Sequence, residues 1–115
     1  MLRRLLALAL CLLGLPALAG ERKLNGAEIH QTLSGHTLKG SSDSGDWSQD
    51  FDPSGRTTYS QGNNNSLGRW EVRDDQYCSV WPPNPNWSCY DVKVDGDVIT
   101  FVTKSGGQSS GTMVK

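Results

Sequence analysis

Few residues of this chain have the types and spacing that catalysis or metal binding requires. Its two histidines, His30 and His36, stand apart from any cysteine pair or close carboxylate set, whereas a structural zinc site takes about four such ligands. We therefore expect both histidines to be polar surface residues, and we expect no metal. No serine occupies a Gly-x-Ser-x-Gly motif, the sharp turn on which many hydrolases carry their nucleophile.

The closely spaced aspartates fall in segments with turn composition, and none continues with the spacing of a calcium-binding loop. Aspartate favours turns because its side chain bonds nearby backbone groups. We interpret these residues as turn residues: Asp50 and Asp52, Asp74 and Asp75, Asp95 and Asp97. Because no catalytic set can be assembled, we predict no enzymatic activity and no cofactor. A hydrolase is the least favoured interpretation.

The cysteines favour a structural role. Of the three in the chain, Cys11 lies in the apolar N-terminal run described below. Cys78 and Cys89 are separated by ten residues and have neither a CxxC spacing nor a histidine nearby, which disfavours a redox or metal pair. In an oxidising compartment such a pair forms a disulfide. We predict a hairpin in which Cys78 faces Cys89, Val80 faces Trp87 and Trp81 faces Asn86.

The tip of that hairpin is the best candidate binding surface in the sequence. Two tryptophans flank a segment that contains three prolines, and tryptophans held beside prolines form a preorganised contact surface of the kind found at binding hot spots. The alternative is that both tryptophans only pack the hairpin end. The candidate binding residues are Trp81, Pro82, Pro83, Pro85 and Trp87.

The N-terminus has the features of a secretory signal peptide. Arg3 and Arg4 precede an apolar run over residues 5–15, and Ala17 and Ala19 form a small-x-small cleavage pattern. We predict that residues 1–19 are removed, and that residues 20–115 form one domain in the periplasm or outside the cell. The net charge of −1 excludes a strongly basic nucleic-acid binder. No second apolar run long enough to span a membrane follows.

Residues 20–115 predict one short helix and about eight short strands. Asn25 can cap a helix that ends near Ser34, with Glu28 completing a capping box. Beyond Gly35, apolar and aromatic alternation is broken by turn residues every nine to eleven positions or so, a pattern typical of sandwiches and barrels. We predict an up-and-down antiparallel meander, lipocalin-like or a half-barrel, with an open bent sheet as the alternative. The expected strands are 36–42, 46–52, 56–61, 67–73, 76–81, 87–94, 98–103 and 108–114.

Strand alternation also assigns the faces of the hairpin. If the cysteines point outward, then Tyr77 and Tyr90 point into the barrel. By the same alternation we expect Trp70, Val72, Val92 and Val94 inside, and we expect six aromatics to fill the interior: Trp47, Tyr59, Trp70, Tyr77, Tyr90 and Phe101. An eight-stranded barrel is filled by side chains or holds one small ligand.

Five different short motifs follow one another along the chain. They are Ser34-Gly35-His36-Thr37-Leu38-x-Gly40, Asp52-Pro53-Ser54-Gly55, Gly68-Arg69-Trp70-x-Val72, Tyr77-Cys78-x-x-Trp81 and Cys89-Tyr90-x-Val92. Together they resemble a family of small exported proteobacterial proteins of unknown function. The resemblance implies a periplasmic β-rich domain and no known catalytic residue. The proline-rich tip departs from the pattern.

The sequence therefore favours a monomeric, non-enzymatic binding module. In the leading interpretation it contacts a protein partner in the cell envelope, as an inhibitor does, through the Trp81 to Trp87 tip. In the alternative interpretation it carries a small molecule in the barrel interior.

Overall fold

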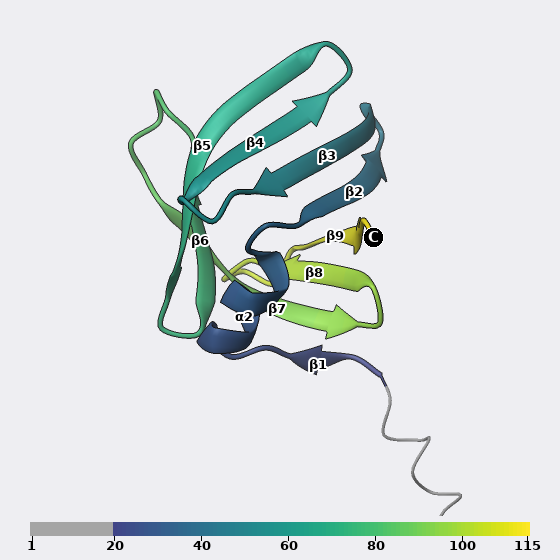
Figure 1. Cartoon of the computed structure of the whole chain (residues 1–115), viewed down its shortest axis with the longest axis vertical. Coiled ribbons are helices and arrows are strands. Elements are labelled where there is room, and N and C mark those ends of the chain that lie inside the picture. The colour runs from purple at the N-terminus through teal and green to yellow at the C-terminus, as the bar shows by residue number, and fades with distance from the viewer. Residues whose placement is uncertain (1–19) are drawn as a thin grey trace, which may run out of the picture.

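The computed structural model describes residues 20–115 and shows a closed antiparallel barrel of eight strands, with one extra strand and one short helix (Figure 1). The predicted signal peptide lies outside the described residues. The elements are β1 (Arg22–Lys23), α2 (Gly26–Leu33), β2 (Thr37–Ser42), β3 (Gly45–Phe51), β4 (Arg56–Gln61), β5 (Asn64–Arg73), β6 (Gln76–Val80), β7 (Ser88–Asp95), β8 (Val98–Val102) and β9 (Gln108–Met113).

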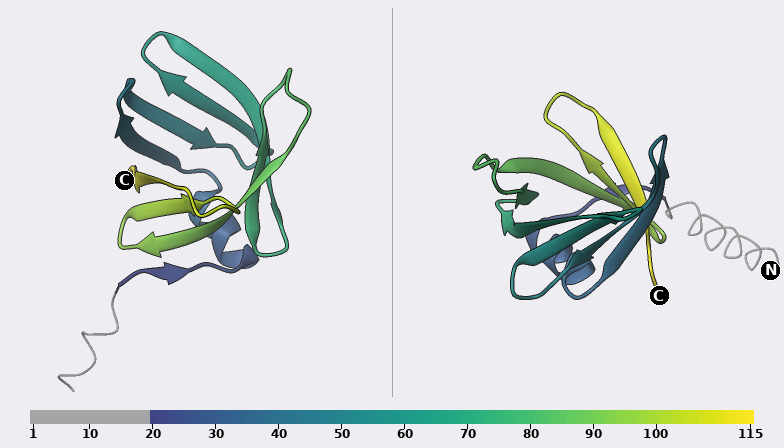
Figure 2. Two further views of the ribbon diagram at one scale, coloured as in Figure 1. Left: turned by 180° about the vertical axis from the view of Figure 1, so that it is seen from behind. Right: turned by 90° about the horizontal axis from the view of Figure 1, so that it is seen from above.

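Strands β2 to β9 follow one another around the barrel, and each pairs with its neighbour in sequence. The barrel closes because β9 returns to β2, where Leu38 faces Met113 and Lys39 faces Thr112. The predicted meander is confirmed, and it is closed, not open and bent. Figure 2 shows it from behind and from above, with the hairpin tips diverging.

Strand β1 is the one strand that the sequence did not predict. It pairs with the second half of β7, where Arg22 faces Val94 and Lys23 faces Lys93. Strand β6 pairs only with the first half of β7, from Ser88 to Tyr90. Strand β1 therefore pairs with the part of this edge of β7 that β6 leaves unpaired.

Helix α2 begins and ends where the sequence predicted. The Asn25 side chain accepts a hydrogen bond from the Glu28 backbone, and the Glu28 side chain accepts one from the Asn25 backbone, which completes the capping box. The side chains of Ile29 and Leu33, on the inner face of the helix, are fully buried. The Gly26 backbone N–H also donates to Asp75 in the β5–β6 turn, so α2 is held against that end of the barrel.

The predicted disulfide between Cys78 and Cys89 is present, with these residues facing each other across β6 and β7. The two further pairs predicted for this hairpin are absent: the ladder ends where Ser79 faces Ser88. The segment that follows has three prolines without a backbone N–H, which cannot donate to a ladder. It forms a turn instead, in which the Asn84 N–H donates to the Trp81 carbonyl.

The barrel interior contains the side chains that alternation assigned to it. Trp70, Tyr77 and Val92 are buried, and Tyr90 packs against them. The predicted filling by six aromatics is confirmed in part, since Trp47 and Tyr59 are only half-buried. The apolar residues with the least exposed surface are Leu24, Ile29, Leu33, Leu38, Phe51, Val92 and Ile99, and two of them belong to α2.

Candidate binding site at the barrel mouth

The end of the barrel opposite α2 carries four connections, which we call the mouth. Because strand direction alternates, the β2–β3, β4–β5, β6–β7 and β8–β9 connections all lie at this end. They span residues 43–44, 62–63, 81–87 and 103–107. No helix covers the mouth among residues 20–115.

A cavity of about 360 Å³ opens at the mouth. Aromatic side chains form much of its wall, and shorter polar side chains complete it. The aromatic residues are Tyr59, Tyr77, Trp81, Tyr90 and Phe101. The polar residues are Gln49, Ser66, Ser79 and Ser109. None of these nine residues carries a charge at neutral pH.

Tyr59 connects the aromatic residues of the mouth. Its ring stacks on Trp47, with centroids 5.6 Å apart, and meets Trp81 edge to face at 6.4 Å. Offset stacking and edge-to-face contacts are the favoured geometries of aromatic pairs. The three side chains come from β3, β4 and the start of the β6–β7 connection, and their contacts join these segments at the mouth.

Three strand glycines provide the space for these indoles. A Cβ atom at Gly40 would lie 2.4 Å from the Trp47 ring, and one at Gly111 would lie 2.8 Å from the same ring. A Cβ atom at Gly68 would lie 2.7 Å from the Trp81 ring. Real Cβ atoms do not approach this closely, so each glycine is required for the indole that covers it.

A polar network forms the floor of the cavity. The Gln49 amide nitrogen donates to the Thr57 hydroxyl at 3.0 Å and to the Tyr77 hydroxyl at 3.1 Å. The Thr57 hydroxyl donates its own proton to the Asp50 carbonyl, so it accepts from Gln49. This fixes the orientation of the Gln49 amide. Both amide hydrogens are then used, and the Gln49 carbonyl oxygen is left as an acceptor in the cavity wall.

Tyr77 keeps its proton at physiological pH. Burial raises the pKa of its hydroxyl above the ordinary value, and hydrogen bonding from Ser79 and Gln49 opposes part of that rise. The Tyr77 oxygen accepts from Gln49, so its O–H is available as a donor. The Ser79 hydroxyl accepts from the Trp81 indole N–H at 3.3 Å. The floor thus offers both donors and acceptors.

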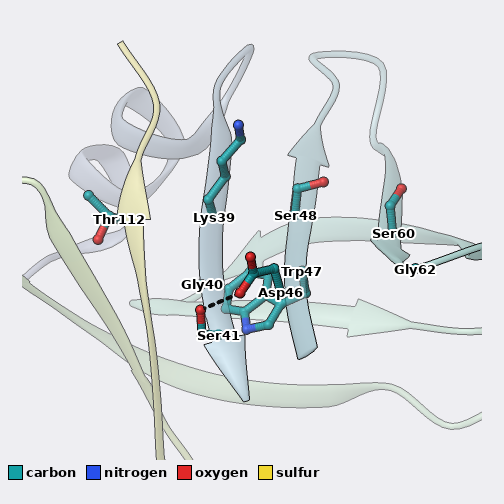
Figure 3. A pocket seen from close by; sticks show the side chains of 9 residues that line it. All are labelled: Lys39, Gly40, Ser41, Asp46, Trp47, Ser48, Ser60, Gly62 and Thr112. Carbon is teal, nitrogen blue, oxygen red and sulfur yellow. Dashed lines mark hydrogen bonds between the residues drawn. The ribbon is translucent and has the colours of Figure 1, made fainter. Parts of the chain in front are cut away.

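A larger hollow, of about 600 Å³, lies on the outer wall (Figure 3). Lys39, Ser48, Ser60 and Thr112 stand side by side across four strands there, and the Ser41 hydroxyl donates to Asp46. Its lining is mostly short polar side chains over an open sheet surface, with Trp47 as its one aromatic residue. Binding pockets are mainly apolar with a few placed polar groups, so the smaller cavity at the mouth is the better candidate.

The residues predicted at the hairpin tip do not form one surface. Trp81 lines the cavity, whereas Trp87 lines a different hollow with Cys89 and has the Arg73 guanidinium over its ring, 4.4 Å from the centroid. Pro82, Pro83 and Pro85 are exposed between them at the rim. The structure therefore brings Trp81 together with Tyr59, and separates it from Trp87.

The histidines lie at the surface, and four of the six aspartates interpreted as turn residues lie outside the strands. Both histidines are exposed, and His30 stacks on Trp70 with ring centroids 5.8 Å apart. Asp52 accepts from the Ser54 N–H in a turn, but Asp50 lies within β3 and Asp95 is the last residue of β7. Within residues 20–115, no three histidine, cysteine or acidic side chains gather as a metal site. No helix in this part of the chain is long and apolar enough to cross a membrane.

Comparison with known proteins adds no relative. The chain matches no family model, no curated protein and no solved structure at a significant level. The resemblance to small exported proteobacterial proteins stays a prediction.

Proposed function

We propose that residues 20–115 form a non-enzymatic binding module that takes an uncharged small molecule into the barrel mouth. One observation carries this proposal: the cavity combines aromatic walls with a hydrogen-bonding floor and has no charged residue in its lining. Such a combination is typical of small-molecule sites, in which apolar walls supply affinity and a few polar groups fix orientation.

The lack of charge in the lining argues for a neutral ligand. A charged group moved from water into this cavity would lose hydration and meet no opposite charge, which is costly. The small-molecule interpretation of the sequence is therefore favoured over the leading one, because Trp81 contributes its ring to the cavity and not to an outward surface with Trp87. We further propose that the protein is an exported monomer, since its disulfide is compatible with an oxidising compartment.

The matched pair Trp81 and Trp87 tests the proposal. As a probe we choose 2-naphthol, a neutral bicyclic molecule with one hydroxyl, and ligand-observed NMR measures its binding. Trp81→Ala should weaken binding at least about tenfold, which corresponds to the contribution of one well-packed aromatic wall. Trp87→Ala should leave binding unchanged. An equal loss of binding in both variants, or absence of binding both by naphthol and by the neutral sugars described below, would refute the proposal, provided circular dichroism shows both variants folded.

Binding of a protein partner at the rim is the second candidate, favoured by the exposure of all three tip prolines. The variant Pro82→Ser/Pro83→Ser alters the tip, and Gln49→Ala alters only the cavity floor. A protein captured from envelope extract should be lost with the first variant and kept with the second. Equal capture by the two variants would remove this candidate.

A further inference from the structure

We infer that the ligand of the mouth is a neutral pyranose ring, either a free sugar or the terminal unit of a longer glycan. This inference rests on the proposed function, because it concerns the same cavity. It follows from the size of the cavity, from its polar groups and from its open rim.

The cavity is large enough for one sugar ring. Water occupies about 30 Å³ in the liquid, so a cavity of about 360 Å³ accommodates roughly a dozen water-sized groups. A hexopyranose has about twelve non-hydrogen atoms, and covalently bonded atoms occupy less space than the same number of separate waters, so one ring fits and leaves room for bridging waters.

The polar groups of the lining are too numerous for an apolar ligand. Six of the nine lining residues carry a hydroxyl, and Gln49 adds an amide. Two of these hydroxyl residues lie deep in the barrel, since Tyr77 and Ser79 are only 4% and 3% exposed. A ligand that displaces water from this floor must replace its hydrogen bonds or lose affinity. A molecule with hydroxyls around its edge can do so, and a flat hydrocarbon cannot.

The aromatic walls suit the apolar faces of the same sugar ring. A pyranose ring has C–H groups on its faces and hydroxyls around its edge. The Tyr59 and Trp81 rings supply apolar surface for such a face, and the negative face of an aromatic ring attracts C–H groups of positive polarity. The hydroxyl edge then meets the Gln49 carbonyl oxygen, which has no hydrogen-bond partner among the described residues, and the serines of the rim.

The experiment compares two ligand classes on one set of variants. Methyl pyranosides of glucose, galactose, mannose and N-acetylglucosamine are titrated alongside 2-naphthol, up to concentrations on the order of 10 mM. We expect at least one pyranoside to bind. We expect Ser66→Ala, at the rim, to weaken that binding about fivefold, the effect of one lost neutral hydrogen bond. The control Ser60→Ala, on the outer wall, should leave it unchanged.

The outcomes separate the two proposals. Binding of naphthol but of no pyranoside would overturn the sugar assignment and leave the proposed function standing. Binding of neither would overturn both. A pyranoside that binds equally to the Ser66→Ala and Ser60→Ala proteins would overturn the placement of its hydroxyls at the rim. The matching methyl glucuronide, which is anionic, should bind more weakly than the glucoside because the lining has no cation to pair with it.

Discussion

Replacement of Gly40 by alanine tests whether the mouth is built around the indole of Trp47. The new Cβ atom would lie 2.4, 2.5 and 2.8 Å from three atoms of the Trp47 ring, whereas carbon atoms in contact are separated by about 3.5 to 4.0 Å. The indole must therefore move by about 1 Å in a packed environment. Overpacking of this kind costs typically about 1–3 kcal/mol, and we expect Gly40→Ala to lower the free energy of unfolding by about 2 kcal/mol.

A second substitution, at Trp47, tests whether the indole causes the loss of stability in Gly40→Ala. The three atoms nearest to a Cβ at Gly40 all belong to the Trp47 side chain, so Trp47→Ala should remove the clash. In that background Gly40→Ala should be neutral or slightly stabilising, because alanine is favoured over glycine in a strand by roughly 0.5–1 kcal/mol. The coupling energy between the two sites should be about 2 kcal/mol. Urea unfolding followed by far-UV circular dichroism measures all four proteins of the cycle.

Gly68 provides the control, because its clash has a backbone component. A Cβ atom there would lie 2.6 Å from the Val80 carbonyl oxygen as well as 2.7 Å from the Trp81 ring. Trp81→Ala should therefore rescue Gly68→Ala only in part. An equal cost of Gly40→Ala with and without Trp47, or equal rescue of both glycine variants, would show that the indole clash is not the cause.

Three further predictions concern stability. Removal of the disulfide by Cys78→Ala/Cys89→Ala should cost about 3 kcal/mol in urea unfolding, because the bond closes a loop of about 12 residues; unchanged unfolding in reductant would contradict this. Asn25→Ala should cost about 1 kcal/mol through loss of the helix cap, and Asn25→Asp, which keeps the acceptor oxygen, should restore most of it. The pKa of Tyr77 is raised in the folded state, so the folded protein holds the phenolic proton more tightly than the unfolded chain does. This contribution to stability is complete below the unfolded pKa of about 10 and is lost as pH rises through the folded pKa; the alkaline loss of stability should be smaller in Tyr77→Phe, and an identical alkaline profile would refute the assignment.

The sequence predicted the elements whose signals are local. The Asn25–Glu28 capping box defined the start of α2, and the alternation around Tyr77 and Tyr90 assigned the faces of β6 and β7. Strand β1 could not be predicted, because two residues carry no periodicity and the pairing depends on where β6 ends. The closed barrel depended on the pairing of β2 with β9, which brings together residues 38 and 113.

The cavity was harder to predict because it is assembled from separate strands. Gln49, Ser66 and Ser109 are unremarkable polar residues until barrel closure brings them to one mouth. Two signals were nonetheless present. The alternation that turns Tyr77 inward applies equally to Trp81, and glycines inside strands, such as Gly40, indicate a close approach by another group.

The contact of Trp47 with two glycines bears on where the barrel opens. Gly40 belongs to β2 and Gly111 to β9, so the indole spans the seam at which the meander closes on itself. That seam has only two register pairs, against three for the disulfide-linked β6–β7 pair and five or six for the other neighbouring strands of the barrel. Local unfolding is expected to begin where the fewest residue pairs join two neighbouring strands. The amides of β9 that face β2 are therefore expected to exchange with solvent first. Since Trp47 stacks on Tyr59, the opening that exposes these amides would also loosen the aromatic wall and widen the entrance to the cavity.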